Sequence, residues 1–239
     1  IRDRNKGVQR YLHMKVEDVR ALLEANKNER GIKHWEKTGI QLSSYGLGLT
    51  QLKKIAKKIG KSHDLALDLW KQDNYDMIVL STMIDEPGKI KREQVEKQVK
   101  GLGFWMLAQA YCSNLMPRVN FQKELAEDWI EEKDDIKRRV AYLLIYNIAR
   151  DDKKLNNSYF YTIIDKIKDS LQKEENFVKD AMNNALIMIG SRSIELNQRA
   201  LAAARQIGYV DVDYGDNSCL ALDASKHLTS KQVQKKIAP

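Results

Sequence analysis

Apolar residues recur at three- and four-residue steps along most of this chain, which is the spacing of one face of an α-helix. The pattern is clearest in residues 121–150, where it predicts one helix over 121–130 and a second one from Ile136 to Ile148. The acidic break EEKDD between them suits the positive N-terminal end of the second helix. Because no stretch alternates convincingly between apolar and polar residues, we expect an all-α protein.

The predicted helices come in pairs that repeat along the chain. The residues that open the second helix of each pair lie 29, 32 and 41 residues apart, and they are Tyr75, Phe104, Ile136 and Phe177. Repeats of this length are typical of stacked helix hairpins. We therefore expect a HEAT-like or ARM-type solenoid, in which α–α repeats stack into a superhelix.

Domain boundaries follow from where the repeat pattern begins and stops. We predict a single HEAT-like repeat domain over residues 1–207, with N-terminal helices in 1–48 and paired-helix repeats in 49–207. The pattern stops after Gly208. Residues 208–239 are therefore expected to form a non-repeat C-terminal cap or tail.

Outside the four pairs, the same spacing predicts further elements. Helices are expected over 16–24 and 194–207, and Thr50 is a suitable cap for a helix that follows it. Residues 209–222 are predicted to be a loop or extended segment. The last seventeen residues are predicted to form a short basic helix or tail.

Composition narrows the class of protein. The two cysteines, Cys112 and Cys219, form no metal-binding or disulfide spacing, and the four histidines are scattered, so we expect neither a metal site nor a cofactor. No apolar run is long enough for a membrane span, and no secretory signal is visible at the start. We expect a cytoplasmic monomer that does not enter the membrane.

The charge balance indicates a polyanionic partner. The chain has 41 Lys and Arg against 33 Asp and Glu, a formal net charge of +8. Such a surplus favours nucleic acid, although it also fits a protein whose charge only keeps it soluble. The densest basic run is QLKKIAKKIGKS, in which five lysines have no acidic residue between them: Lys53, Lys54, Lys57, Lys58 and Lys61. They form either a solvated helix face or an edge that contacts phosphates.

A solenoid of helix pairs leaves a concave surface lined by the second helices, so polar groups on those helices are expected to converge. Trp105 and Gln109 lie one helical turn apart on one such helix, as do Asp180 and Asn184 on another. Further candidates to line this groove are Lys137, Arg138, Arg139, Lys179, Asn183 and Arg192. Such a cationic groove with an aromatic side chain would hold a phosphodiester backbone.

Other interpretations of these residues stay open. Tryptophans are often core residues, and we expect Trp35, Trp70 and Trp129 to be buried, with Trp105 in either role. Two basic residues at the start of the helix after the acidic break, Arg138 and Arg139, fit ion pairs with Asp134 and Asp135 as well as DNA contacts.

Several stretches together resemble the bacterial DNA alkylation repair enzymes built from HEAT-like repeats. The resemblance covers roughly 45–206 and includes YGLGLTQLKKIAKKIGKSHDLALDLW, the Trp105 helix with CSNLM, IKRRVAYLL and NFVKDAMNNALIMIG. It implies an all-α solenoid that holds double-stranded DNA in a basic concave groove. It also implies a DNA glycosylase that removes N3- and N7-alkylated purines in base excision repair.

The resemblance also implies catalytic residues. In the family, a Trp, an Asp one turn later, an Arg on the next inner helix and a second Trp stabilise the positive charge that develops on the sugar. The matching positions here hold Trp105, Gln109, Arg139 and Asn184. A neutral Gln109 lacks the negative charge of the Asp, and Asn184 lacks a ring. Asp180, one turn before Asn184, is a candidate for a displaced carboxylate.

Three functions therefore remain open from the sequence. The first is an alkylpurine DNA glycosylase or a divergent relative. The second is a catalytically inactive homologue that binds DNA, which the residues Gln109 and Asn184 favour. The third is a protein-binding scaffold, a frequent use of paired-helix repeats.

Overall fold

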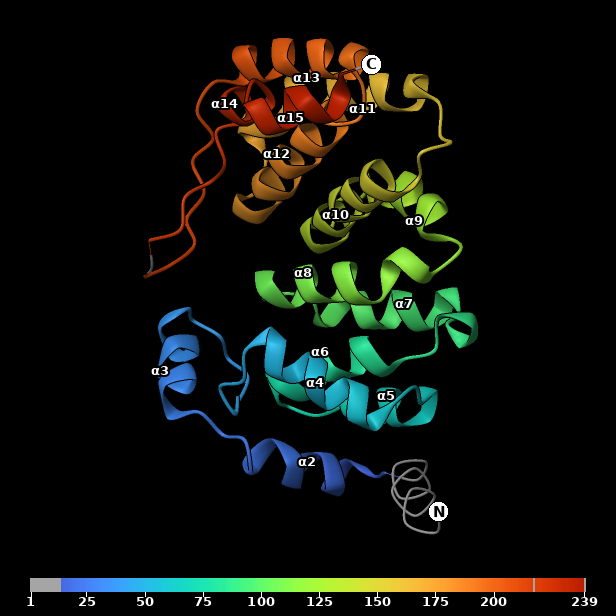
Figure 1. Cartoon of the computed structure of the whole chain (residues 1–239), viewed down its shortest axis with the longest axis vertical. Coiled ribbons are helices and arrows are strands. Elements are labelled where there is room, and N and C mark those ends of the chain that lie inside the picture. The colour runs from blue at the N-terminus through green and yellow to red at the C-terminus, as the bar shows by residue number, and fades with distance from the viewer. Residues whose placement is uncertain (1–13, 217, 239) are drawn as a thin grey trace. The chain divides into compact units, whose positions relative to one another are not determined.

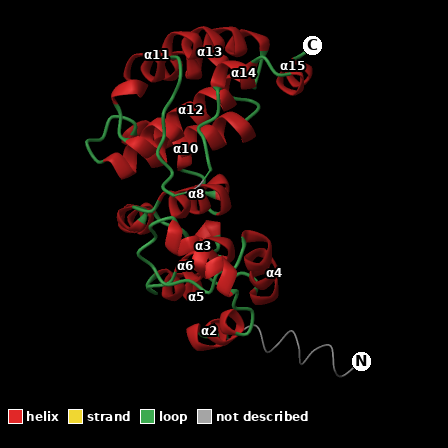
Figure 2. Cartoon of the chain, turned by 90° about the vertical axis from the view of Figure 1, so that its left-hand side faces the viewer, coloured by secondary structure: helices red, strands yellow, loops and turns green. Residues whose placement is uncertain are grey.

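In the computed structural model, which describes residues 14–216 and 218–238, the chain is helical and its described part contains no β-strand (Figures 1 and 2). The chain divides into two compact units, Ile1–Val119 and Asn120–Tyr214. The short segment Gly215–Asn217 groups with the first unit, and Ser218–Pro239 groups with the second. The predicted all-α class is thus confirmed.

The first unit is built around a helix that is buried on almost every side. Its described helices are α2 (Val16–Glu24), α3 (Glu29–Lys37), α4 (Leu49–Ile59), α5 (His63–Trp70), α6 (Tyr75–Ile84), α7 (Arg92–Gln98) and α8 (Trp105–Asn114). Helix α6 packs against α4, α5 and α8, and nine of its ten residues are buried. A helix that is buried on nearly every side needs such neighbours, so α6 forms the core of this unit.

The second unit repeats the helix pairing. Its described helices are α9 (Gln122–Trp129), α10 (Asp135–Asp151), α11 (Tyr161–Ser170), α12 (Asn176–Gly190), α13 (Ile194–Ile207), α14 (Ala224–Leu228) and α15 (Lys231–Ile237). Helix α10 packs between α9 and α12, and α12 in turn packs against α13 and α14. Because each helix buries one face on the next, neighbouring pairs share a core, as expected for paired-helix repeats.

Most predicted helices lie where the spacing placed them, and two details differ. The helix expected to start after Thr50 begins at Leu49 instead. Its cap is Gly48, whose backbone N–H donates to Oε1 of Gln51 at 3.4 Å. The last seventeen residues form two short helices, α14 and α15, rather than one.

Of the three tryptophans expected in the core, Trp129 is 1% exposed, whereas Trp35 and Trp70 are half-buried. Each of the two half-buried rings instead contacts a tyrosine ring, Trp35 in a tilted arrangement and Trp70 edge-on. The ring centroids of Trp35 and Tyr75 are 4.8 Å apart, and those of Trp70 and Tyr111 are 5.4 Å apart.

A buried carboxylate, Asp76, holds the glycine-rich loop before α4. Asp76 has no exposed surface and accepts hydrogen bonds from the hydroxyl of Ser44 at 2.7 Å, the backbone N–H of Tyr45 at 2.6 Å and that of Leu47 at 3.2 Å. Burial raises the pKa of the Asp76 carboxyl, and these three donors lower it. The donors supply the hydrogen bonds that the carboxylate lost with water.

The same loop requires a glycine at its tightest point. Gly46 has a φ of +73°, and a Cβ at that position would lie 2.2 Å from the carbonyl oxygen of Asn28. Side chains are excluded there for both reasons, which fixes the path of the chain from α3 into α4.

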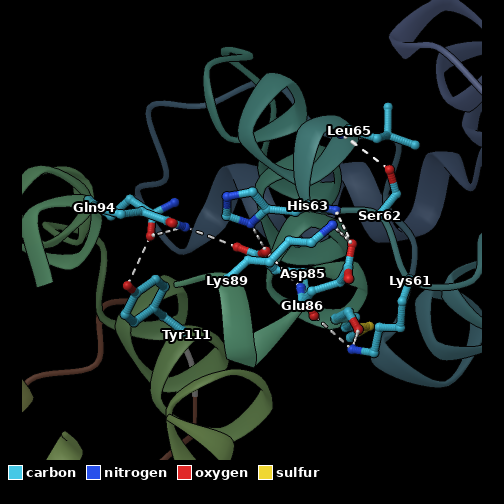
Figure 3. A network of polar contacts seen from close by, with 11 residues as sticks. Lys61, Ser62, His63, Leu65, Asp85, Glu86, Lys89, Gln94 and Tyr111 are labelled. Carbon is cyan, nitrogen blue, oxygen red and sulfur yellow. Dashed lines mark hydrogen bonds and ion pairs between the residues drawn. The ribbon is translucent and has the colours of Figure 1, made fainter. Parts of the chain in front are cut away.

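A second polar network joins α5, α6, α7 and α8 (Figure 3). Oδ1 of Asp85 lies 2.6 Å from Nδ1 of His63, and its Oδ2 accepts from Nε2 of Gln94 at 3.0 Å. Gln98 extends the network, because its Oε1 accepts from the hydroxyl of Tyr111 at 2.9 Å. Side chains far apart in the sequence are thereby held at fixed positions at the C-terminal end of α6.

Replacing Asp76 tests whether the loop depends on it. Asp76→Ala leaves the hydroxyl of Ser44 and two buried backbone N–H groups without their acceptor, and we expect it to reduce the free energy of unfolding by about 2–4 kcal/mol. Urea denaturation measures the change. Asp73→Ala is the control, because the Asp73 side chain is exposed, and it should change stability by less than about 0.5 kcal/mol. Equal effects of the two substitutions would contradict the role of Asp76.

Candidate nucleic-acid interface

Four lysines of α4 lie on its solvent side. Its buried side consists of Leu52, Ile55 and Ile59, which pack into the first unit. The four lysines, which we call the α4 lysine cluster, are exposed and form no ion pair or side-chain hydrogen bond with the described residues; they are Lys53, Lys54, Lys57 and Lys58. Their charges are therefore available to a polyanion.

Aromatic rings form a connected series in the same unit. Beyond the contact of Trp35 with Tyr75, the rings of Tyr75 and Phe104 are 6.1 Å apart and those of Phe104 and Trp105 are 6.2 Å apart. Tyr75 is buried, whereas Trp35, Phe104 and Trp105 are half-buried. The sequence marked two of these residues as helix openers but did not reveal the series, because its members come from α3, α6 and the start of α8.

Gln109 lies one turn after Trp105 on α8 and is exposed. Its side chain is a neutral amide. It therefore provides hydrogen bonds at this position but no negative charge to oppose a developing cation.

In the second unit, Asp180 of α12 is enclosed by hydrogen-bond donors. Its Oδ1 accepts from the hydroxyl of Tyr214 at 2.7 Å and from Nδ2 of Asn184 at 2.8 Å. Burial raises the pKa of the Asp180 carboxyl, while these two donors and the charge of Arg139 lower it. Arg139, on α10, is only 5% exposed. The structure thus brings Arg139, Asp180 and Asn184 into one region.

Tyr214 reaches Asp180 because the segment before it is fastened to α12. The Asn176 side chain donates to the carbonyl of Asp213 at 2.6 Å and accepts from its backbone N–H at 2.8 Å. The rings of Phe177 and Tyr214 are 6.3 Å apart. The contact of Tyr214 with Asp180 was not predicted from the sequence. The alternation of apolar Val210 and Val212, which are buried, with exposed polar neighbours indicates that this segment packs on one side.

The basic residues at the start of α10 are engaged within the protein. Arg138 pairs with Glu174 at 2.8 Å and with Asp135, and its Nη1 donates to the carbonyls of residues 132 and 133. The predicted alternative that Arg138 pairs with Asp135 is thus confirmed. Asp134 instead caps α10 by accepting from the backbone N–H groups of Ile136 and Lys137.

The other basic candidates of the second unit differ from one another. Lys137 lies 3.3 Å from Glu132, with its ammonium 5.5 Å from the centre of the Trp129 ring. Arg192 donates to three backbone carbonyls, those of residues 149, 152 and 155. Lys179 is half-buried. A DNA contact by any of the three stays a prediction, and the geometry of Arg192 favours a structural role.

The predicted site residues are distributed over both units. Trp105 and Gln109 belong to the first, and Arg139, Asp180 and Asn184 belong to the second. Their convergence on one concave groove stays a prediction.

Two other kinds of feature, metal-binding clusters and membrane-spanning helices, are absent from the described residues. No three His, Cys, Asp or Glu side chains within 14–216 and 218–238 gather in a way that would hold a metal ion. Over the same ranges, every helix is too short or too polar to cross a lipid bilayer.

Removing one hydroxyl tests the contact between Tyr214 and Asp180. We expect Tyr214→Phe to reduce the free energy of unfolding by about 1–3 kcal/mol near neutral pH, because the half-buried carboxylate of Asp180 loses a donor. The substitution raises the pKa of Asp180 further above its value in the unfolded chain. The loss of stability should therefore grow as pH rises and Asp180 ionises, and it should fade in acid, where Asp180 is protonated. Urea denaturation near pH 4 and pH 8 measures both effects. Tyr209→Phe is the control, because Tyr209 is 73% exposed, and an equal loss in both variants would contradict the assignment.

Comparison with known proteins places the chain in a family. The model of the DNA alkylation repair enzyme family matches residues 19–228. Uncharacterized protein Lin0241 of Listeria innocua and uncharacterized protein Lmo0209 of Listeria monocytogenes are each 29% identical to the chain over 212 residues. In each case the match covers 86% of this chain and 92% of the relative.

A solved structure is similar over nearly the whole length, with a TM-score of 0.83 and 25% sequence identity, covering 94% of this chain and 96% of the other. It represents a new family of proteins related to the HEAT-like repeat DNA glycosylases with affinity for branched DNA structures. This similarity confirms the predicted HEAT-like fold. Since the family match spans most of the sequence, the chain belongs to the DNA alkylation repair enzyme family.

Proposed function

We propose that this protein binds DNA through its first unit and that it binds branched DNA more tightly than linear duplex. The observation that carries the proposal is the α4 lysine cluster, four exposed cations on one helix without an acidic partner in the part of the chain that the structure describes. The similarity to a structure from a family with affinity for branched DNA structures supports the preference.

Electrostatics explains why such a surface favours DNA. Each lysine that neutralises a phosphate releases a condensed counterion, and this release drives binding regardless of base sequence. At a branch point, the backbones of several duplex arms come close together. A compact group of cations then neutralises more phosphates within one Debye length than it does on a single duplex.

The aromatic series offers a second reason for the preference. Base pairs at a branch point open more readily than those inside a duplex, and opened bases stack on aromatic rings. Phe104 and Trp105 are half-buried and lie in the same unit as the α4 lysine cluster. Stacking on such rings adds affinity for distorted DNA without reading its sequence.

Excision of N3- or N7-alkylated purines is the second candidate function, and the presence of Trp105 and Arg139 at the family positions favours it. Two observations weigh against it. The exposed Gln109 has no charge, and the carboxylate of Asp180 already accepts two hydrogen bonds from protein side chains. Since loss of a single electrostatic contact of this kind costs about 3–4 kcal/mol of barrier, we infer that the protein binds DNA without cutting the glycosidic bond.

The binding proposal is tested with a labelled four-way junction and a linear duplex of the same length. We expect tighter binding to the junction, with an affinity that falls steeply as salt rises. Replacing all four lysines of the α4 lysine cluster with Gln should weaken binding at least about tenfold. It should also reduce the slope of the logarithm of the binding constant against the logarithm of the salt concentration by about 2–4 in magnitude.

Lys166→Gln combined with Lys168→Gln is a control for nonspecific charge loss, because both lysines pair with acids of the second unit. It should change the affinity for the junction by less than about twofold. Binding that is insensitive to salt, or that survives the loss of the four α4 lysines, would rule out the proposal and favour a protein-binding scaffold.

Base excision is tested separately on duplex DNA that carries N3-methyladenine and N7-methylguanine. The wild-type protein should release methylpurine no faster than the DNA does alone. Gln109→Asp should raise the release at least about tenfold, because a carboxylate restores charge next to Trp105. Gln109→Asn is the matched control and should stay inactive. Release by the wild type well above the spontaneous rate would show that excision does not need a carboxylate at this position.

A further inference from the structure

A cationic pocket opens beside the α4 lysine cluster in the first unit. It has a volume of about 380 Å³, and none of the described Asp or Glu residues lines it. Its walls come from α4, the C-terminal end of α6, the end of α8 and the turn after α8. The lining residues are Lys53, Ala56, Lys57, Gly60, Lys61, Met83, Asn114 and Arg118. We call it the α4–α8 pocket.

Two of its four cations are held in place by backbone carbonyls. Nζ of Lys61 donates to the carbonyl of Met83 at 2.7 Å and to that of Asp85 at 3.0 Å, at the end of α6 (Figure 3). Nη2 of Arg118 donates to the carbonyl of Asn114 at 2.7 Å, at the end of α8. These carbonyls are among those that a helix leaves unpaired at its C-terminus, so both cations also cap helices.

Capping does not use all the donors of the two side chains. Lys61 has a third hydrogen, and Arg118 has its Nε and Nη1 groups, and none of these donates to another of the described residues. Asn114 is itself fixed, because its Nδ2 donates to Oγ1 of Thr82 at 3.1 Å. The pocket thus has donors at fixed positions that remain available.

The two anchored cations are close enough to affect each other. Burial lowers the pKa of the Lys61 ammonium, and the charge of Arg118 lowers it further, whereas Asp85 and Glu86 raise it. Glu86 is engaged elsewhere by Lys89 at 2.9 Å, and Asp85 by His63. An anion in the pocket would relieve the repulsion between the two cations.

The other two cations, Lys53 and Lys57, have no capping role. They are exposed, lie one turn apart on α4, and form no ion pair with the described residues. Helix capping therefore accounts for the positions of Lys61 and Arg118. It does not account for the presence of four cations around one cavity. Lys54 and Lys58 are on the same helix but do not line the pocket.

We propose that the α4–α8 pocket binds one phosphate group of the DNA backbone and anchors the DNA on the first unit. The inference rests on the proposed DNA binding and adds to it the place where a phosphate is held. Several donors around one cavity match the oxygens of a phosphate, and cations from three elements hold it from different directions. A flat basic surface makes only transient contacts by comparison.

Two variants with equal charge test the pocket. Lys53→Gln with Lys57→Gln removes two cations from the pocket, and Lys54→Gln with Lys58→Gln removes two from the same helix outside it. Neither pair makes a side-chain contact that the fold needs, so both variants should keep the melting temperature of the wild type. Because both variants lose two positive charges, a difference in their phosphate or DNA binding reflects the α4–α8 pocket rather than the net charge.

The first measurement uses inorganic phosphate and the ¹⁵N-labelled full chain at constant ionic strength. Saturable shifts of the backbone amide signals of Ala56 and Gly60 are expected in the wild type and the Lys54/Lys58 variant, and not in the Lys53/Lys57 variant. Shifts that do not saturate, or that persist in the Lys53/Lys57 variant, would contradict phosphate binding by the α4–α8 pocket. This measurement needs no DNA, so it tests phosphate binding by the pocket even if the proposed DNA binding fails.

The second measurement tests whether the phosphate group that the pocket binds belongs to the DNA backbone. Adding a four-way junction should shift the same amide signals. The Lys53/Lys57 variant should bind the junction at least about fivefold more weakly than the Lys54/Lys58 variant. Equal losses in the two variants would mean that α4 acts as a diffuse charged face. A junction that binds without moving these signals would overturn the assignment to the DNA backbone.

Discussion

The hydrogen bonds that the buried Asp76 carboxylate accepts fix the glycine-rich loop and occupy its backbone N–H groups. Glycine-rich loops often bind phosphate with their backbone N–H groups. Here two N–H groups of such a loop, those of Tyr45 and Leu47, donate to the protein's own carboxylate. These two N–H groups are therefore not available to an external anion, and the loop leads directly into α4. The proposed anion binding would accordingly depend on the side chains of α4 rather than on the backbone of the loop.

The distribution of ion pairs supports the same conclusion. The chain carries a formal net charge of +8, but a surplus matters to DNA only where cations are unpaired. In the second unit, Arg138 is engaged by Glu174 and Arg192 by backbone carbonyls. Such contacts are costly to give up, because each buried partner would lose its hydrogen bond. Lys53, Lys54, Lys57 and Lys58 of α4 form no ion pair with the described residues, which is why we assign the proposed phosphate contacts to them.

Local patterns in the sequence predicted most of the helices, because periodicity and caps lie within a few residues of each other. The helices 16–24 and 194–207 were predicted with the bounds they have, and Ser193 caps the second of them. The candidate site was less predictable. The contact of Tyr214 with Asp180 spans 34 residues, and Arg118 joins the lysines of α4 only through the packing of α8. Spacing along the chain carries no information on contacts that tertiary packing creates.

The residues at the two candidate carboxylate positions, Gln109 and Asp180, favour DNA binding without base excision. A carboxylate that stabilises a cationic sugar must be ionised and free to face the substrate. Gln109 is free but has no charge, whereas Asp180 is enclosed, with burial raising its pKa and protein donors on its Oδ1. If Oδ1 of Asp180 turned to a substrate, it would give up its hydrogen bonds with Tyr214 and Asn184, and the first of these helps to hold the segment after α13 against α12. The present hydrogen bonds of this carboxylate therefore favour a role in the fold over contact with a substrate.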